Sequence, residues 1–232
     1  MLVFAIILVV SGALIIGALW GLYGYMPDWI QGNLLALAGG ALVISVVLEM
    51  IQPAIGESGL WTTVAFTVLG AVVFTGIDYL IDEKMQNKGG AGLLAAITLD
   101  GIPENLALGV ALIGGNALQV AALAGSILLS NLPEAAGGAK QMRDGGSSHK
   151  KILMLWIGAA ILLSLAAIIG KMLLKDVDDA VISAIDCFAA GAVIASLATE
   201  VFPSAFKDGN HWAGISTAIG LVLALGLNQL GG

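Results

Sequence analysis

Two Pro-Glu motifs lie inside long apolar stretches of the chain. The first, "LDGIPENLALGV" (99–110), contains Asp100 and Glu104, and the second, "LLSNLPEAAGGA" (128–139), contains Glu134. A charge in the middle of a membrane helix costs about 2.5–3.5 kcal/mol on insertion scales. No lysine or arginine falls deep in either stretch, so the sequence predicts that bound protons or a mobile cation neutralise these acids.

The spacing of the residues in both motifs favours a metal site with oxygen ligands. Asp100 and Glu104 are four residues apart, which places them on one face of a helix. The proline before each glutamate removes one helix hydrogen bond and so frees a carbonyl oxygen. Oxygen ligands suit Mn²⁺ or Mg²⁺, whereas imidazole and thiolate favour zinc. Asn131 and Ser130 precede Glu134 by three and four residues and give its helix a similar polar face. We therefore expect a central metal site with Asp100, Glu104 and Glu134.

Four further acids lie within the apolar stretches, namely Glu49, Asp78, Asp186 and Glu200. For Asp78 and Asp186, simple hydration near a helix end is an equally good interpretation. The topology predicted below places Glu49 and Asp186 toward the outside and Glu200 and Asp78 toward the cytoplasm. The four acids would then form steps of a cation pathway on either side of the central site.

The composition is that of an integral membrane protein. Hydrophobic residues make up 59% of the 232 positions and charged residues 11%, against about 25% charged residues in a soluble domain. The mean hydropathy is +0.99. A helix needs roughly 20 apolar residues to cross a bilayer. We predict an all-α fold, a single transmembrane domain over residues 1–232, with eight spans at about 1–22, 32–52, 60–81, 91–113, 117–139, 151–174, 180–203 and 211–230.

The basic residues predict the orientation of these spans. Seven of the nine lie in the connections after the first, third, fifth and seventh spans, and cytoplasmic loops carry the excess of lysine and arginine. Both termini should therefore lie outside the cytoplasm. The membrane is expected to be the cell (inner) membrane. The first span lacks a basic leading segment and is expected to be an anchor rather than a signal peptide.

Two pairs of segments repeat along the chain. "GALVISVVLE" (40–49) matches "GAVIASLATE" (191–200), and "SGALIIG" (11–17) matches "SLAAIIG" (164–170). Residues 1–81 and 151–232 thus read as two copies of three helices, inverted relative to each other, with residues 91–139 between them. This 3+2+3 arrangement with inverted repeats is typical of transporters.

The eight spans, the external termini and the Pro-Glu motifs resemble the ZIP (Zrt-, Irt-like protein) divalent-metal transporters. The fourth helix of that family usually reads His-Asn-x-Pro-Glu-Gly, where this chain has "DGIPEN" (100–105); the fifth carries a similar Pro-Glu segment, here "SNLPEA" (130–135); and "TEVFP" (199–203) is similar to the family's seventh helix. The resemblance implies that Asp100, Glu104 and Glu134 are metal ligands and that Asn131 and Ser130 are weaker ones.

Departures from the family pattern concern the ligands. Gly101 replaces an asparagine ligand, the sixth span lacks the family's glutamate, and the two histidines, His149 and His211, lie in or beside connections. The resemblance therefore supports one metal site and leaves a second in doubt.

The sequence thus predicts a transporter, not an enzyme, that moves Zn²⁺, Fe²⁺ or Mn²⁺ into the cytoplasm by alternating access. A degenerate relative that binds metal as a sensor or partner without transporting it is the main alternative. An intramembrane hydrolase is disfavoured, because no Gly-x-Gly-Asp run and no histidine deep in a span are present. The expected partners are the lipid bilayer and divalent cations, with no nucleic acid, and the sequence leaves a homodimer open.

Overall fold

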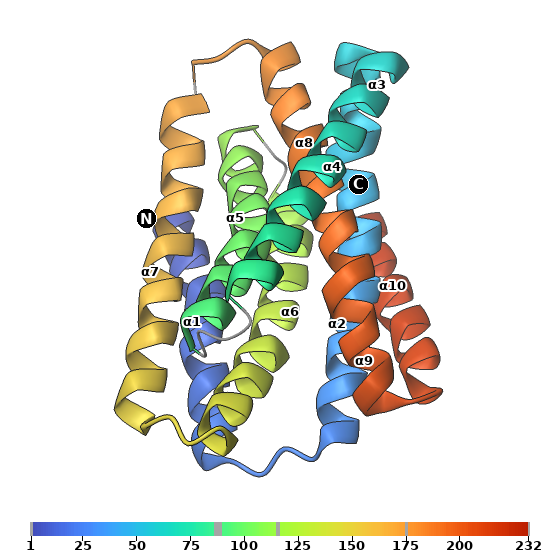
Figure 1. Ribbon diagram of the computed structural model, residues 1–232. Coiled ribbons are helices and arrows are strands. Elements are labelled where there is room, and N and C mark those ends of the chain that lie inside the picture. The colour runs from blue at the N-terminus through green and yellow to red at the C-terminus, as the bar shows by residue number, and fades with distance from the viewer. Residues whose placement is uncertain (1, 86–89, 115–116, 175, 232) are drawn as a thin grey trace.

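Long helices form the part of the chain that the structure describes (Figure 1). The computed structural model describes the backbone of residues 2–85, 90–114, 117–174 and 176–231, and side chains there except those of 2–4, 82, 84–85, 90–100, 114, 117–119 and 230–231. No strand occurs in these ranges, so the predicted all-α class is confirmed. The elements are α1 (Leu2–Tyr23), α2 (Asp28–Val46), η1 (Val47–Ile51), α3 (Gln52–Ser58), α4 (Leu60–Met85), α5 (Gly90–Gly114), α6 (Ala117–Asp144), α7 (His149–Leu174), α8 (Asp179–Ser196), η2 (Leu197–Val201), α9 (Phe202–Gly209) and α10 (Trp212–Gly231).

Seven helical stretches among the described residues are long and apolar enough to cross a membrane. The protein is accordingly a multi-pass membrane protein. Within α5, the predicted fourth span, the residues whose side chains are described form a shorter apolar helix, Gly101–Ile113. The seven stretches are Ala5–Tyr23, Asp28–Ser58, Leu60–Ile81, Val120–Asp144, His149–Leu174, Asp179–Gly209 and Trp212–Gln229.

Two π turns, η1 and η2, interrupt otherwise continuous α-helices. The amide of Gln52 donates to the carbonyl of Val47, and the amide of Phe202 donates to that of Leu197. These are i→i−5 hydrogen bonds, and a proline, whose nitrogen cannot donate, follows each of the two amides. The sequence did not predict these turns, although Glu49 and Glu200 lie inside them. Conversely, α5 and α6 continue as α-helix through the prolines of the two Pro-Glu motifs.

The helices pack mainly as four pairs: α1 with α6, α5 with α7, α2 with α10, and α4 with α8. Glycines bring the last two pairs together. A Cβ atom added to Gly40 would lie 2.0 Å from the carbonyl oxygen of Thr217 on α10, and one added to Gly191 would lie 1.9 Å from that of Thr67 on α4. Small residues at such contacts allow membrane helices to approach closely.

Residues that repeat in the sequence take equivalent places in this packing. Gly40 and Gly191 occupy the same position in the two copies, and each packs on a carbonyl of a helix from the other copy. Ser11 and Ser164 are also equivalent, and their hydroxyl oxygens lie 2.8 Å apart, at hydrogen-bond distance. Figure 1 shows α2 and α8 running in opposite directions. The contacts between the copies are thus reciprocal.

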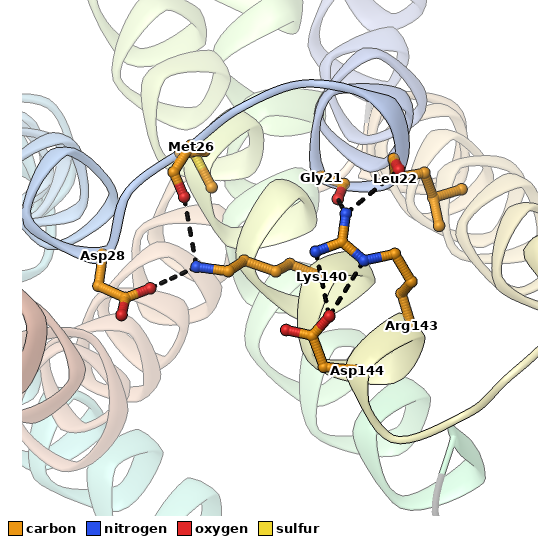
Figure 2. A network of polar contacts seen from close by, with 7 residues as sticks. All are labelled: Gly21, Leu22, Met26, Asp28, Lys140, Arg143 and Asp144. Atoms are coloured by element: carbon orange, nitrogen blue, oxygen red, sulfur yellow. Dashed lines mark hydrogen bonds and ion pairs between the residues drawn. The ribbon is translucent and has the colours of Figure 1, made fainter.

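Basic side chains close the ends of two helix pairs. Nη1 of Arg143 on α6 donates to the carbonyl oxygens of Gly21 and Leu22 at the end of α1, at 2.9 and 3.2 Å (Figure 2). At the other end of the molecule, Nζ of Lys171 on α7 donates to the carbonyl oxygen of Leu112 on α5 at 2.8 Å. Cations at helix C-termini satisfy carbonyls that have no partner within the helix.

Alanine at Gly191 should separate α8 from α4 and lower the apparent unfolding temperature. Its methyl group would overlap the backbone oxygen of Thr67, and overpacking typically costs about 1–3 kcal/mol, each kcal/mol shifting the midpoint by roughly 2–4 °C in a chain of this size. Gly76→Ala is the matched control, because nothing lies within 4 Å of a Cβ added to that glycine of α4. Thermal unfolding of both purified variants in detergent checks this; an equal midpoint for the two would contradict the packing described.

Candidate metal site and acidic cavity

The predicted central site lies on two contacting helices, α5 and α6. Glu104 is buried, with 7% of its surface exposed, and Glu134 on α6 is half-buried. Asp100 belongs to α5, but its side chain lies outside the described residues. The structure therefore places two of the three predicted carboxylate ligands inside the helix bundle and leaves the third untested.

The weaker predicted ligands, Asn131 and Ser130, are buried side chains on α6. Nδ2 of Asn131 donates to the carbonyl oxygen of Val10 on α1 at 3.3 Å. The Oγ of Ser130 donates to the carbonyl oxygen of Ile127 at 3.0 Å. The hydrogen bond that each side chain donates fixes its orientation. Each side chain can then offer an oxygen lone pair to a cation.

Asn105 is a candidate ligand that the sequence analysis did not single out. Its side chain is 1% exposed, and its Nδ2 donates to the carbonyl oxygen of Gly101 at 2.9 Å. Its Oδ1 is buried and, among the described residues, has no hydrogen-bond partner. A buried amide oxygen without a partner is costly, and a cation bound beside Glu104 would satisfy it. The position of Asn105 directly after the first Pro-Glu motif is the sequence signal that could have identified it as a candidate ligand.

An acidic cavity of about 440 Å³ connects the second Pro-Glu motif with the second π turn. Glu134 of α6 and Glu200 of η2 both line it, although the sequence placed them at different stages of the pathway. Its other charged lining residues are Asp28, Asp144, Asp208, Lys140 and Lys207. Five carboxylates against two ammonium groups leave a net negative charge, which raises the local concentration of cations.

The rim of this cavity is tied together by Lys140 of α6 (Figure 2). Its Nζ forms an ion pair with Asp28, the first residue of α2, and donates to the carbonyl oxygen of Met26 at 3.3 Å. The Asp28 side chain is 71% exposed, so this end of the cavity faces the surface. The ion pair thus joins α6 to the start of α2, and the hydrogen bond joins α6 to the connection between α1 and α2.

The remaining predicted pathway acids do not line the acidic cavity. Asp78 on α4 and Asp186 on α8 are half-buried. Both carboxylate oxygens of Glu49 in η1 are buried without a hydrogen bond among the described residues, although the side chain of Asn228 on α10 lies near them. An unpartnered buried carboxylate is costly unless a proton or cation neutralises it. Glu49 therefore has the property expected of a pathway residue, but of the four pathway acids it is Glu200 that lines the acidic cavity together with Glu134.

Within the part of the chain whose side chains are described, no three histidine, cysteine or acidic side chains come together as a metal-binding group. A central site would therefore need Asp100, or the amide and carbonyl oxygens of α5 and α6, to complete its shell. Comparison of the sequence with protein-family models and with curated proteins gives no match.

Proposed function

We propose that the protein is a transporter that moves divalent metal cations across a membrane into the cytoplasm, as a divergent relative of the ZIP transporters. The observation that carries this proposal is the acidic cavity, in which Glu134 of a Pro-Glu motif and Glu200 of a π turn share one net-negative space. An ion bound between α5 and α6 would leave through this cavity. Metal uptake by proteoliposomes that contain the purified protein tests the proposal.

The proposed architecture has eight spans in a 3+2+3 arrangement, with α1–α4 and α7–α10 as inverted repeats around α5 and α6. Reciprocal packing supports it, since Gly40 and Gly191 each contact a helix of the other copy. The Ser11–Ser164 contact supports it as well, because equivalent atoms can touch each other only beside a two-fold axis. Inverted repeats are common in transporters, where they allow two related halves to open a site alternately to each side.

The proposed cycle is alternating access, in which α1, α5, α6 and α7 move against the other helices. Basic residues flank the connection between α6 and α7, with Lys140 and Arg143 near the end of α6 and Lys150 and Lys151 at the start of α7, which favours the cytoplasmic side for this end of the molecule. The acidic cavity lies at the same end, so the structure would represent a state open toward the cytoplasm. Glu49 and Asp186 would then attract the ion on the outer side.

The transported ion is proposed to be Mn²⁺, Fe²⁺ or Zn²⁺. The candidate ligands Glu104, Glu134, Asn105, Asn131 and Ser130 offer only oxygen atoms, and oxygen-only sites favour harder ions than imidazole-containing sites do. Zinc binds most sites more tightly than manganese does, so we expect weak discrimination rather than a reversed preference.

Metal binding without transport is the second candidate function. Departures from the family's ligand pattern favour it, since Gly101 stands where the family has an asparagine ligand and the sixth span lacks the family's glutamate. The two functions differ in one observation: a sensor would bind metal but would not move it into vesicles.

Topology provides a prediction that is independent of the metal. We expect a cysteine at Ser147, in a Cys187→Ala background, to be protected from an impermeant thiol reagent in intact cells and labelled after the membrane is permeabilised. Ser147 lies in the connection between α6 and α7. A cysteine at Glu57, which is exposed on α3, is the matched control and should react in intact cells. Labelling of the Ser147 variant in intact cells would reverse the proposed orientation.

The ion pair between Lys140 and Asp28 should influence the uptake rate. If α6 moves relative to α2, the pair has to break, so Lys140→Asp or Asp28→Lys alone should change the initial rate by about two- to fivefold, as expected for a partly exposed pair worth about 0.2–1 kcal/mol. The double exchange should bring the rate back toward that of the wild type. Stopped-flow uptake measures all four proteins; if the double variant shows only the summed effects of the single variants, the pair has no role in the cycle.

A further inference from the structure

An apolar crevice of about 640 Å³ lies between α4, α5, α7 and α8. Its walls include Phe66 of α4, Leu106 of α5, Leu173 of α7 and Phe188 of α8, and Thr62 contributes the one polar side chain in its lining. The crevice lies near the end of α7 and the start of α8, the upper end in Figure 1, whereas the acidic cavity lies near the end of α6.

The surroundings of this crevice identify what can fill it. Three of its four helices, α4, α7 and α8, belong to membrane-spanning stretches. Its rim is continuous with their bilayer-facing surface, where Leu173 is 70% and Val181 49% exposed. Water would find almost no hydrogen-bond partners between these walls, and the hydrocarbon region of a bilayer supplies acyl chains instead.

Two alanines that line the crevice correspond to larger side chains in the first copy of the repeat. In the register that aligns Gly40 with Gly191, Ala180 and Ala184 of the crevice correspond to Trp29 and Asn33 of α2. Asn33 Oδ1 accepts a hydrogen bond from Ser216 on α10 at 2.8 Å, and its Nδ2 donates to the carbonyl oxygen of Trp29 at 2.7 Å. The first copy thus carries a large side chain and a polar contact where the second copy has two alanines.

We propose that this crevice is a lipid-binding site that holds one acyl chain of a membrane phospholipid. The chain lies along Ala180 and Ala184 of α8, between α7 and α4, and α5 forms the floor. Since the walls are apolar and open sideways into the bilayer, the site recognises the hydrocarbon chain rather than the head group. The bound lipid differs from the surrounding bilayer lipid in that four helices contact it.

The test uses the full-length protein in vesicles of phosphatidylcholine that contain a small fraction of the same lipid with a photoreactive diazirine in one acyl chain. We expect labelled peptides to concentrate on residues 62–66 and 169–188. Ala184→Trp should reduce this labelling by at least about tenfold, the loss expected when roughly two methylene groups lose their burial. Ala218→Trp, at an exposed position of α10 outside the crevice, is the matched control and should leave the labelling unchanged.

Ala180→Trp provides a second variant at the exposed rim of the crevice, in case Ala184→Trp does not fold. It places tryptophan where the first copy already has one, so the fold should accept it. Labelling spread evenly over the exposed faces of α4, α7 and α10, and equal in wild type and Ala180→Trp, would show ordinary bilayer contact only and would overturn the proposal. The readout is independent of transport, so a failure here does not bear on the proposed function.

Discussion

Replacing Glu134 with glutamine should abolish metal uptake and weaken metal binding at the central site by more than about 100-fold. Loss of an outer-shell partner already costs about 10–100-fold in metal affinity, and Glu134 is proposed to be a direct ligand. Among the predicted ligands whose side chains the structure describes, it is also the one that lines the acidic cavity. The same side chain would therefore hold the ion and release it toward the exit. Calorimetric titration of Mn²⁺ into detergent-purified protein measures the binding part.

Two variants separate this effect from a general loss of charge. Glu57→Gln removes an exposed carboxylate on α3 and should change neither binding nor uptake. Glu200→Gln removes the carboxylate that the second π turn contributes to the acidic cavity. This variant should take up metal more slowly, while equilibrium binding of metal persists. If Glu134→Gln binds Mn²⁺ as the wild type does, Glu134 is not a ligand; if Glu200→Gln loses all binding, Glu200 belongs to the central site rather than to the exit.

Replacing Asp100 with histidine should raise the preference for zinc over manganese by at least about tenfold, which corresponds to ~1.4 kcal/mol. The substitution introduces an imidazole nitrogen at the position where the ZIP family motif has histidine, and imidazole suits zinc better than manganese. Asp100→Asn is the matched control at the same position, because its amide keeps an oxygen ligand and adds no imidazole nitrogen that could bind the metal.

Competition between zinc and manganese at two pH values measures this preference. Because carboxylate ligands bind metal in the deprotonated form, metal binding should release protons and weaken as the pH falls. This dependence should extend to higher pH in Asp100→His than in Asp100→Asn, since an imidazole titrates near neutral pH. A wild type that is strongly selective for zinc, unchanged by the histidine and insensitive to pH would contradict an oxygen-ligand site.

Much of the fold could be predicted because membrane spans depend on local composition. Each long apolar run forms a helix, since only a helix satisfies its own backbone inside a bilayer. The repeated segments around Gly40 and Gly191 also predicted equivalent positions, and the structure gives both glycines the same kind of contact. These features require only the order of residues within a segment or a comparison of two segments.

Features that depend on contacts between distant segments could not be predicted in this way. The sharing of one cavity by Glu134 and Glu200 and the ion pair of Lys140 with Asp28 join residues far apart in the chain. The π turns could not be predicted for a different reason. A proline in a helix can produce a kink, a break or a wider turn, and which of these forms depends on the surrounding packing. Pro103 lies in unbroken helix, whereas Pro53 follows a π turn.

Uptake of Mn²⁺ into proteoliposomes tests the proposed transport most directly. The purified protein is reconstituted into vesicles that contain a metal-sensitive dye, Mn²⁺ is added outside, and the initial rate is compared with vesicles that contain Glu134→Gln and with protein-free vesicles. We predict a saturable signal for the wild type and the rate of protein-free vesicles for the variant. A wild type that binds Mn²⁺ in detergent but gives the same rate as protein-free vesicles would contradict transport and would favour a metal-binding protein that does not move its ion.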